Sequence, residues 1–443
     1  MPNTTLSRVT PDTVHATLAR VMLADGFDLV LDWENSHGVR LHDSKHNRTF
    51  LDMFSCFASA PLGFNHPRLL EPEFVAKLGR IAVNKPSNAD VYTVEMAEFV
   101  DTFRRIAQPA GMPHVFFIEG GALGVENAMK TAMDWKVRKN LAAGRGEKGH
   151  QVLHFRDCFH GRSGYTVSCT STDPVKTMYF AKFDWPRVTN PKLSFPITPE
   201  VLQRVEATEK QAVREIEAAF AANPHDICAI LIEPIQAEGG DNHFRGEFLR
   251  ELRRLADEHE AFLIFDEVQT GIGTSGKMWA FEHFGVVPDA IAFGKKVQLG
   301  GCWVGPRVDE VPDNVFKIAS RINSTWGGNL TDMVRSQRIL EIIADEKLVE
   351  NSARVGERLR RGLEELASRF PDRMSNARGR GLMCAFDLPD KATRDTLRRK
   401  CFAHGMMILA CGDHSIRFRP ALVVAEAEID EALEILAVAL GEG

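Results

Sequence analysis

The strongest constraint on the fold is a regular alternation of short apolar segments with longer helical patterns, between about residues 85 and 330. The apolar segments are HVFFIEGG, QVLHFRD, ICAILIEP, AFLIFDEV and AIAFGKK. The helical patterns between them include VENAMKTAMDWKVRK, AVREIEAAFAANP and FLRELRRLADEHE. Strands that are apolar throughout are typical of a sheet buried on both faces. The pattern therefore predicts an α/β fold with a mostly parallel sheet covered by helices.

After residue 330 the pattern changes to long amphipathic helices around short strands such as GLMCAFDL and SIRFRPALV, which predicts a smaller α+β unit. A chain of 443 residues is also too long for one ordinary hydrophobic core. We expect three parts. They are an N-terminal segment over 1–84 that contributes to the small domain, a large domain over 85–330 and a C-terminal small domain over 331–443.

Composition and charge argue against several classes of protein. The longest apolar runs fall short of the roughly 18 to 20 residues of a membrane span. The first twenty residues contain no apolar stretch behind a basic start, so we expect no secretion signal and a cytoplasmic location. A net charge of −6 with interspersed signs argues against a nucleic-acid surface. None of the eight cysteines lies in a C-x-x-C pair, so no metal site is predicted.

Charged side chains follow the ends of the predicted strands, where ligands bind in sheets of this kind. Lys295 and Lys296 follow AIAFG, and we expect Lys296 to be solvated. For Lys295 there are two interpretations: a solvated side chain, as for Lys296, or a desolvated amine that acts as a nucleophile. Asp266 and Glu267 close another strand, either as partly desolvated functional carboxylates or as parts of a cap or salt-bridged turn.

Other groups at these ends suit an anionic, planar ligand. The turn in IEGGALG precedes a helix beginning near Ala122, whose free N–H groups suit a single phosphate, although a plain tight turn is common. In DCFHGRSG, Phe159 offers a ring for stacking and Arg162 a fork for a carboxylate. Arg417 and Arg419 share one strand face, for which solvation is the alternative.

A phosphate-binding P-loop is an alternative from a different class of protein. The stretch GIGTSGKM over 271–278 matches G-x-x-x-x-G-K. Met278, however, stands where a serine or threonine must bind magnesium, and the acidic strand precedes the loop instead of following it. We therefore disfavour a P-loop ATPase, and a scaffold with an inactive site as well.

Together these groups are what pyridoxal 5'-phosphate (PLP) chemistry needs. They are a lysine nucleophile, an acidic strand end, a phosphate-sized anion site, an aromatic ring and arginines that bind carboxylates. The chain also resembles the class III, fold type I, PLP-dependent aminotransferases over nearly its whole length. Within that class it is similar to the bacterial lysine 6-aminotransferases. The stretches that carry the resemblance are FDEVQTGIGTSGKMWAFEHFGVVPDAIAFGKK, EGGALGVENAMK, FHGR, EPIQAEGGDNHF, INSTWGGN and CGDHSIRFRP.

The resemblance implies a role for each matching residue around PLP. Lys295 binds the cofactor covalently and Asp266 pairs with its ring nitrogen, and these two are the catalytic residues. The remaining cofactor-binding residues are Gly121 and Ala122 at the phosphate, Phe159 and Val268 on the ring faces, Gln269 at the ring oxygen, and His160. Thr325 is expected at the phosphate of the neighbouring subunit's cofactor, which implies a homodimer with shared active sites.

The resemblance also implies the substrates. It predicts transfer of the ε-amino group of L-lysine to 2-oxoglutarate, giving 2-aminoadipate 6-semialdehyde and L-glutamate. Arg162 is expected at the distal carboxylate of lysine and Arg417 at the carboxylate of glutamate. Glu238 is expected to cover Arg417 during the lysine half-reaction, and Gln269 and Asn323 are expected to line the substrate path. Transfer from 4-aminobutyrate or ornithine is the alternative within the class.

Overall fold

The computed structural model describes residues 9–442 of the chain. Residues 1–8, which begin the predicted N-terminal segment and the stretch read for a secretion signal, and residue 443 lie outside this range. Within residues 9–442, no helix is long and apolar enough to cross a membrane.

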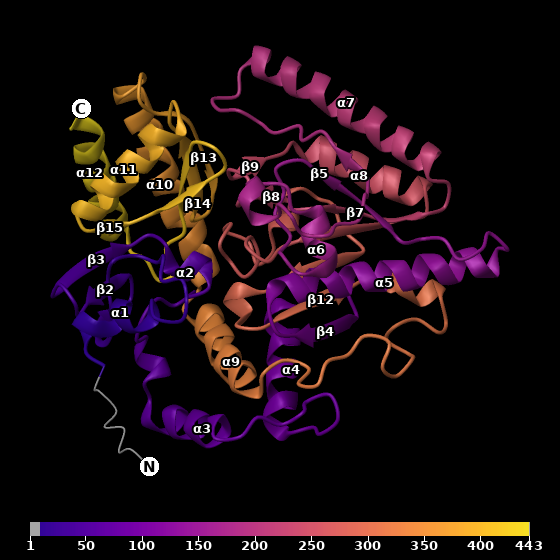
Figure 1. Cartoon of the computed structure of the whole chain (residues 1–443), viewed down its shortest axis with the longest axis horizontal. Coiled ribbons are helices and arrows are strands. Elements are labelled where there is room, and N and C mark those ends of the chain that lie inside the picture. The colour runs from indigo at the N-terminus through magenta and orange to yellow at the C-terminus, as the bar shows by residue number, and fades with distance from the viewer. Residues whose placement is uncertain (1–8, 443) are drawn as a thin grey trace.

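A seven-stranded sheet forms the centre of the large domain, in the order β4-β12-β11-β10-β7-β5-β6, and Figure 1 labels its strands β4, β5, β7 and β12. Its strands are β4 (His114–Ile118), β5 (Gln151–Phe155), β6 (Arg187–Val188), β7 (Ile227–Ile232), β10 (Phe262–Asp266), β11 (Ala290–Phe293) and β12 (Gly300–Val304). Strand β10 is parallel to both of its neighbours, whereas β12 is antiparallel to β11 and β4. The prediction of a mostly parallel sheet is therefore confirmed. The two glycines that open β12 gave no strand signal in the sequence.

Helices cover both faces of this sheet. Successive residues of each strand point to opposite faces, so an apolar strand has apolar side chains on both faces to bury. Phe262 and Ile264 of β10 belong to an apolar cluster with α5, whereas Leu263 and Phe265 belong to another cluster with α8. The principal helices of this part are α4 (Val94–Ala107), α5 (Gly121–Ala142), α6 (Gly164–Cys169), α7 (Pro199–Ala222) and α8 (Gly246–Glu258). The carboxyl ends of β5, β7, β10 and β11 thus open at one edge between two helical layers.

The smaller unit contains a four-stranded antiparallel sheet in the order β13-β14-β17-β16. Its strands are β13 (Ser375–Arg380), β14 (Met383–Asp387), β16 (Leu409–Cys411) and β17 (Ser415–Phe418). It is accompanied by helices α9 (Leu330–Asp345), α10 (Leu348–Arg369), α11 (Lys391–Ala403) and α12 (Glu426–Gly441). The α+β character predicted after residue 330 is confirmed.

The beginning of the chain joins its end in a second four-stranded sheet, where β3 pairs in parallel with β15. In Figure 1 the first strands lie beside the C-terminal elements. The strands are β1 (Leu31–His37), β2 (Arg40–Asp43), β3 (Arg48–Asp52) and β15 (Met406–Met407), and the helices near the start are α1 (Val14–Leu18), α2 (Ser55–Ala58) and α3 (Pro72–Ala82). This pairing agrees with an N-terminal segment that joins the small domain, and the limits at 84/85 and 330/331 stay a prediction.

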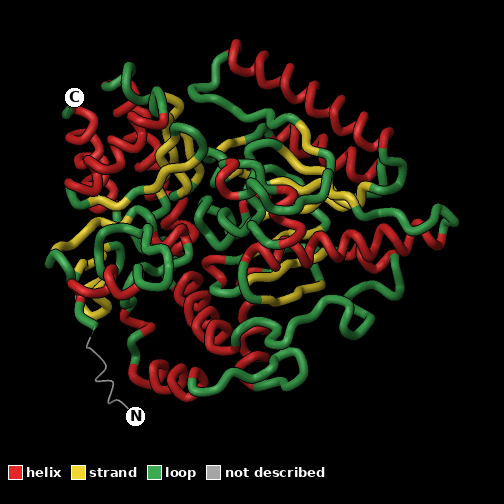
Figure 2. Tube along the Cα trace, viewed as in Figure 1, coloured by secondary structure: helices red, strands yellow, loops and turns green. Residues whose placement is uncertain are grey.

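Two connections carry residues of the predicted site. A short hairpin of β8 (Ile235–Gln236) and β9 (Asn242–His243) follows β7 and holds Glu238 in its turn. A long connection over 305–329, which Figure 2 shows almost entirely as loop, joins β12 to α9 and carries Asn323 and Thr325.

Candidate active site

Lys295 lies directly after β11, at the edge of the sheet where the strands end. Gly294 permits a close approach here, because a Cβ at this position would lie 3.0 Å from Gly121 Cα. Lys295 Nζ donates a hydrogen bond to the Phe57 carbonyl at 2.9 Å. Burial, followed by the positive charge of Arg417, lowers the pKa of Lys295 from 10.5 to about 8. Its amine is therefore much more available as a nucleophile than that of an ordinary lysine.

Lys296 corrects one prediction, since it is buried rather than solvated. Its Nζ donates to the Gln269 carbonyl at 2.8 Å, and its side chain is 2% exposed. The chain turns into a short 3-10 helix at Lys295, so the two adjacent side chains leave in different directions. Lys296 thereby ties the Lys295 turn to the segment that follows β10.

Asp266 ends β10 and forms a buried pair with His160. Asp266 Oδ2 lies 2.8 Å from His160 Nδ1, and Asp266 Oδ1 accepts from Val268 N at 3.1 Å. Burial opposes protonation of His160, but Cys158 and the hydrogen bond to Asp266 outweigh it, so the pKa of His160 lies well above its usual value. The contact with His160 keeps the Asp266 carboxylate oriented.

Two further buried glutamates fix the segments around this pair. Glu233 accepts from Phe159 N at 2.9 Å and from Ala237 N at 3.0 Å, and burial raises its pKa to about 7. Glu267 accepts from the N–H groups of Ala280 and Phe281 at 2.9 and 2.8 Å. Of the two carboxylates that close β10, Asp266 therefore faces the site and Glu267 holds a turn.

The predicted anion site lies at the start of α5, which begins at Gly121. Gly120, before it, has a φ of +87° that favours glycine. A Cβ on Gly121 would lie 2.7 Å from Val268 Cγ1, so the start of α5 packs directly against Val268, which follows Asp266 by two residues. Ala122 is half-buried and lies against Gly161. The first N–H groups of a helix have no partner within it, and Gly121 lies beside Gly294 and Val268, so the start of α5 lies at the same edge as Lys295 and Asp266.

Arg417 and Arg419 are 1% and 0% exposed, so the alternative of a solvated strand face is wrong. Arg419 Nη1 donates to Asp241 Oδ2 at 2.8 Å, and its Nη2 binds the other oxygen of this fully buried carboxylate. Arg417 Nη2 donates to Glu238 Oε2 at 2.6 Å. The Nε and Nη1 atoms of Arg417 are buried without a hydrogen-bond partner among the described residues.

The remaining predicted residues divide into two groups. Phe159, Val268 and Gln269 are half-buried beside Asp266, and the Gln269 Oε1 atom has no partner within residues 9–442. Three others lie on the surface and, in the described part of the chain, have no hydrogen bond or ion pair to Lys295 or Arg417: Arg162, Asn323 and Thr325. The roles of these three stay predictions, and that of Thr325 concerns a neighbouring subunit.

The segment 271–278 does not form the loop that the P-loop alternative requires. Thr274 and Ser275 are 1% exposed, and the Thr274 carbonyl accepts hydrogen bonds from Leu382 N and Ser352 Oγ in the small domain. A loop packed in this way presents no row of free N–H groups at a helix start. Gly273 and Gly276 of this stretch lie against Val349 and Ala353 of the small domain.

Comparison with known proteins decides the family. The family model of the class-III aminotransferases matches residues 23–440. The chain belongs to the class-III aminotransferases. It is 52% identical to the L-lysine-epsilon aminotransferase of Mycobacterium tuberculosis over 97% of this chain and 96% of that one. It is 33% identical to the mitochondrial 4-aminobutyrate aminotransferase of Mus musculus over 92% of this chain and 84% of the relative.

A solved structure of the lysine aminotransferase from M. tuberculosis, in its internal aldimine form, superimposes with a TM-score of 0.96 at 52% identity and covers 98% of this chain and 99% of that one. A transaminase from the marine bacterium Virgibacillus shares the fold at 21% identity, with a TM-score of 0.83. The predicted fold type, aminotransferase activity and PLP dependence are thereby confirmed.

The residues present fit PLP as the cofactor of this class-III aminotransferase. The start of α5 offers N–H groups for a phosphate, and the buried Asp266 carboxylate suits a protonated ring nitrogen. The Gln269 Oε1 atom, which has no partner among the described residues, can bind a polar substituent of the cofactor ring. The amine of Lys295 has a lowered pKa. Within residues 9–442, no group of three or more histidine, cysteine or acidic side chains is arranged to hold a metal ion.

Three contacts of this class-III aminotransferase site were not predicted from the sequence. The Phe57 carbonyl that holds Lys295 lies in α2 (Ser55–Ala58), a single left-handed turn whose residues all have a positive φ although none is glycine. Lys176 binds Glu238, and Asp241 binds Arg419. Asp241 is part of the stretch EGGDNHF that carries the resemblance, whereas nothing in the sequence around Lys176 indicates a role.

Proposed function

We propose that the protein is an L-lysine 6-aminotransferase, which transfers the ε-amino group of L-lysine to 2-oxoglutarate and forms 2-aminoadipate 6-semialdehyde and L-glutamate. The observation that carries this proposal is the state of Arg417, a buried arginine covered by a carboxylate on only one of its nitrogens. Relatives at 52% identity over nearly the full length bear the name of this activity. The 4-aminobutyrate aminotransferases are similar at 33% identity.

The two substrates place opposite demands on Arg417. Glutamate carries a carboxylate on the carbon that bears its reacting amine, and Arg417 suits that carboxylate. Lysine, reacting through its ε-amine, has no carboxylate at that carbon. An uncovered Arg417 would then bind the α-carboxylate of lysine and present the wrong amine. Glu238 resolves this conflict if it covers Arg417 in the lysine half-reaction and leaves it in the glutamate half-reaction.

When bound, PLP supplies an electrophilic aldehyde carbon and a ring that withdraws electrons from the substrate carbon. The residues of the chain supply the rest. Lys295 Nζ would hold the cofactor and, when free and unprotonated, would take a proton from the substrate carbon and deliver it to the aldehyde carbon of the cofactor. Asp266, oriented by His160, keeps the ring nitrogen protonated. Gln269 and Phe159 orient the ring, and the start of α5 holds the phosphate.

The distal end of lysine requires a second carboxylate site, for which we propose Arg162 with Asn323 nearby. Both are exposed in the single chain. Large apolar side chains are also exposed around 83–94 and 178–183, as expected of a surface that a second subunit covers. We therefore propose a homodimer in which this surface and Thr325 complete the neighbouring site, and sedimentation at the mass of two chains would support it. The expected cytoplasmic location belongs to the same proposal.

The function is tested by following the label of [ε-¹⁵N]lysine or [α-¹⁵N]lysine in separate reactions with 2-oxoglutarate. We expect ¹⁵N-glutamate from the ε-labelled substrate alone, because Glu238 excludes the α-carboxylate from Arg417. Ornithine and 4-aminobutyrate are the comparison substrates. Turnover of 4-aminobutyrate without turnover of lysine, or transfer of the α-label, would overturn the proposal.

A further inference from the structure

Glu238 is held by two cations, of which the function proposed above uses only one. Its Oε2 atom accepts from Arg417 Nη2 at 2.6 Å, and its Oε1 atom lies 2.5 Å from Lys176 Nζ. Arg417 is fully buried, whereas the side chains of Lys176 and Glu238 are 27% and 21% exposed. Glu238 therefore lies between a buried arginine and a lysine that reaches solvent.

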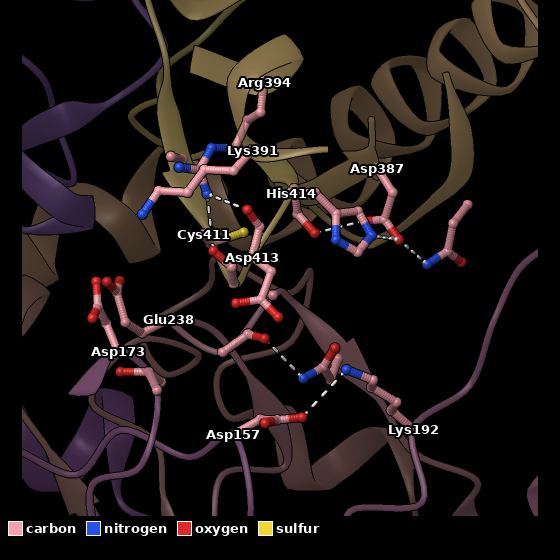
Figure 3. Close-up of a pocket in the computed structure, with 18 of the residues that line it drawn as sticks. Asp157, Asp173, Lys192, Glu238, Asp387, Lys391, Arg394, Cys411, Asp413 and His414 are labelled. Carbon is pink, nitrogen blue, oxygen red and sulfur yellow. Dashed lines mark hydrogen bonds and ion pairs between the residues drawn. The ribbon is translucent and has the colours of Figure 1, made fainter. Parts of the chain in front are cut away.

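Lys176 stands on the outer side of Glu238. A cavity of about 610 Å³ between the large and small domains is lined by both Glu238 and Lys176, and Arg417 is not among its lining residues. Figure 3 shows this cavity, with Glu238 and Asp173 among its labelled residues. If the Glu238 side chain moves away from Arg417 towards this cavity, it enters a polar space that Lys176 lines.

The backbone around Lys176 is fixed by local contacts. Lys176 ends the 3-10 helix Pro174–Lys176, and Asp173 caps that helix by accepting from Val175 N at 3.0 Å. The Lys176 ammonium also lies 5.5 Å from the centre of the Phe159 ring. The base of the side chain is thus held in place, while its four-carbon stem lets the ammonium follow a moving carboxylate.

The two positions of Glu238 differ in what they need from Lys176. When Glu238 covers Arg417, the arginine already neutralises it. When Glu238 has left Arg417, a partly buried carboxylate without a cation is costly. Lys176 already binds Glu238 and also lines the cavity that Glu238 would enter, so this one cation can stay paired with the carboxylate in both positions.

We propose that Lys176 is a positioning residue for Glu238, keeping its ion pair with this carboxylate as Glu238 moves from Arg417 into the cavity. The inference rests on the proposed function, in which Glu238 uncovers Arg417 for the carboxylate of glutamate. Loss of Lys176 most strongly destabilises the state in which Glu238 has left Arg417. Substrates that need a free Arg417 therefore lose affinity, while the lysine half-reaction changes little.

The test compares the wild-type holoenzyme with Lys176→Met, Lys176→Arg and Lys192→Met. Lys192 is a matched control, because it lines the same cavity but pairs with Asp157 at 3.2 Å instead of with Glu238. Calorimetry measures the affinity for glutarate, a dicarboxylate with no amine or ketone to react. Single-turnover absorbance measurements give the rates with lysine and with 2-oxoglutarate separately.

We expect Lys176→Met to weaken glutarate binding and raise the KM for 2-oxoglutarate by about tenfold, with the lysine half-reaction within about twofold. Lys176→Arg restores most of the loss, and Lys192→Met leaves all three values near those of the wild type. In a Glu238→Gln background, Lys176→Met should add little, because Lys176 acts through Glu238.

Equal losses in both half-reactions, or unchanged glutarate binding by Lys176→Met, would overturn the role of Lys176. A loss of folding in Lys176→Met is recognised by its unfolding midpoint, and Lys176→Gln, which removes the charge but keeps a polar side chain, then decides through the same glutarate measurement. Glutarate binding does not depend on lysine turnover. A wild-type enzyme that binds glutarate but does not use lysine therefore overturns the proposed function and leaves this inference to be judged separately.

Discussion

The cofactor side and the substrate side of the site differ in how completely their charged groups are paired. On the cofactor side, Asp266, His160 and Glu233 are all buried, both oxygens of each carboxylate have a partner, and only His160 Nε2 among their polar side-chain atoms lacks one within the described residues. On the substrate side, Arg417 is equally buried but has two nitrogens without a partner among the described residues. Its single carboxylate, Glu238, is partly exposed and shared with a lysine.

Arg419 is held by its carboxylate more completely than Arg417, although its Nε also lacks a partner among the described residues. It follows β17 two residues after Arg417, and it binds both oxygens of a carboxylate that is 0% exposed. The same hairpin turn provides both acids, Glu238 and Asp241. The comparison teaches that Asp241 and Asp266, which have one task, are buried with both oxygens paired, whereas Glu238, which must release Arg417 for one substrate, is partly exposed and shared between two cations.

The largest effect is expected on the cofactor side, where one change should affect both half-reactions alike. Asp266→Asn keeps the shape of the side chain but removes the charge that holds the ring nitrogen protonated. We expect both half-reactions to slow by about 10² to 10³-fold, measured by single-turnover absorbance with lysine and with 2-oxoglutarate. A loss confined to one substrate would contradict the division into a cofactor side and a substrate side.

The next effect should be specific to one substrate. Arg417→Gln removes the partner of the glutamate carboxylate, so we expect the 2-oxoglutarate half-reaction to lose about 10² in kcat/KM and the lysine half-reaction to lose about tenfold or less. Arg419→Gln is the matched control. It leaves Asp241 buried and unpaired at a cost of about 3 to 5 kcal/mol, whereas Glu238 keeps Lys176 when Arg417 is replaced. Urea unfolding should therefore separate the two variants, and equal midpoints would remove the distinction between the arginines.

The two sides also differ in how far the sequence predicts them. Lys295 and Asp266 were predictable, because each follows an apolar strand whose end must lie at the edge of the sheet. The burial of Lys296 was not, since it depends on a carbonyl 27 residues away that only the folded chain brings near. Lys176 and Glu238 lie 62 residues apart, and their pairing requires the exact path of a loop. The pairing of β3 with β15, between opposite ends of the chain, was equally hidden.

A smaller effect with the opposite specificity is expected at Glu238. Glu238→Gln removes the charge that covers Arg417, so the α-carboxylate of lysine competes for this arginine. We expect the lysine half-reaction to slow by about tenfold, while glutamate and 2-oxoglutarate react at least as fast as with the wild type. The fraction of α-¹⁵N transferred from lysine to glutamate should rise above the wild-type background. If the label still comes only from the ε-position at the wild-type rate, Glu238 does not control which amine reacts.

The smallest effect joins the two sides through the pKa of Lys295. Burial and then the charge of Arg417 lower this pKa to about 8, so the reactive unprotonated amine is about a tenth of the total at pH 7 and predominates above pH 8. PLP uptake by the cofactor-free protein, followed by absorbance, should accordingly speed up with pH and level off above about 8.

In Arg417→Gln the repulsion from the arginine is gone, which raises the pKa of Lys295 and moves the midpoint to higher pH by less than about one unit. Lys192→Met, a change of charge outside the site, should leave the midpoint in place. An unchanged midpoint in Arg417→Gln would mean that burial alone sets the reactivity of Lys295 and that the substrate side does not influence the base on the cofactor side.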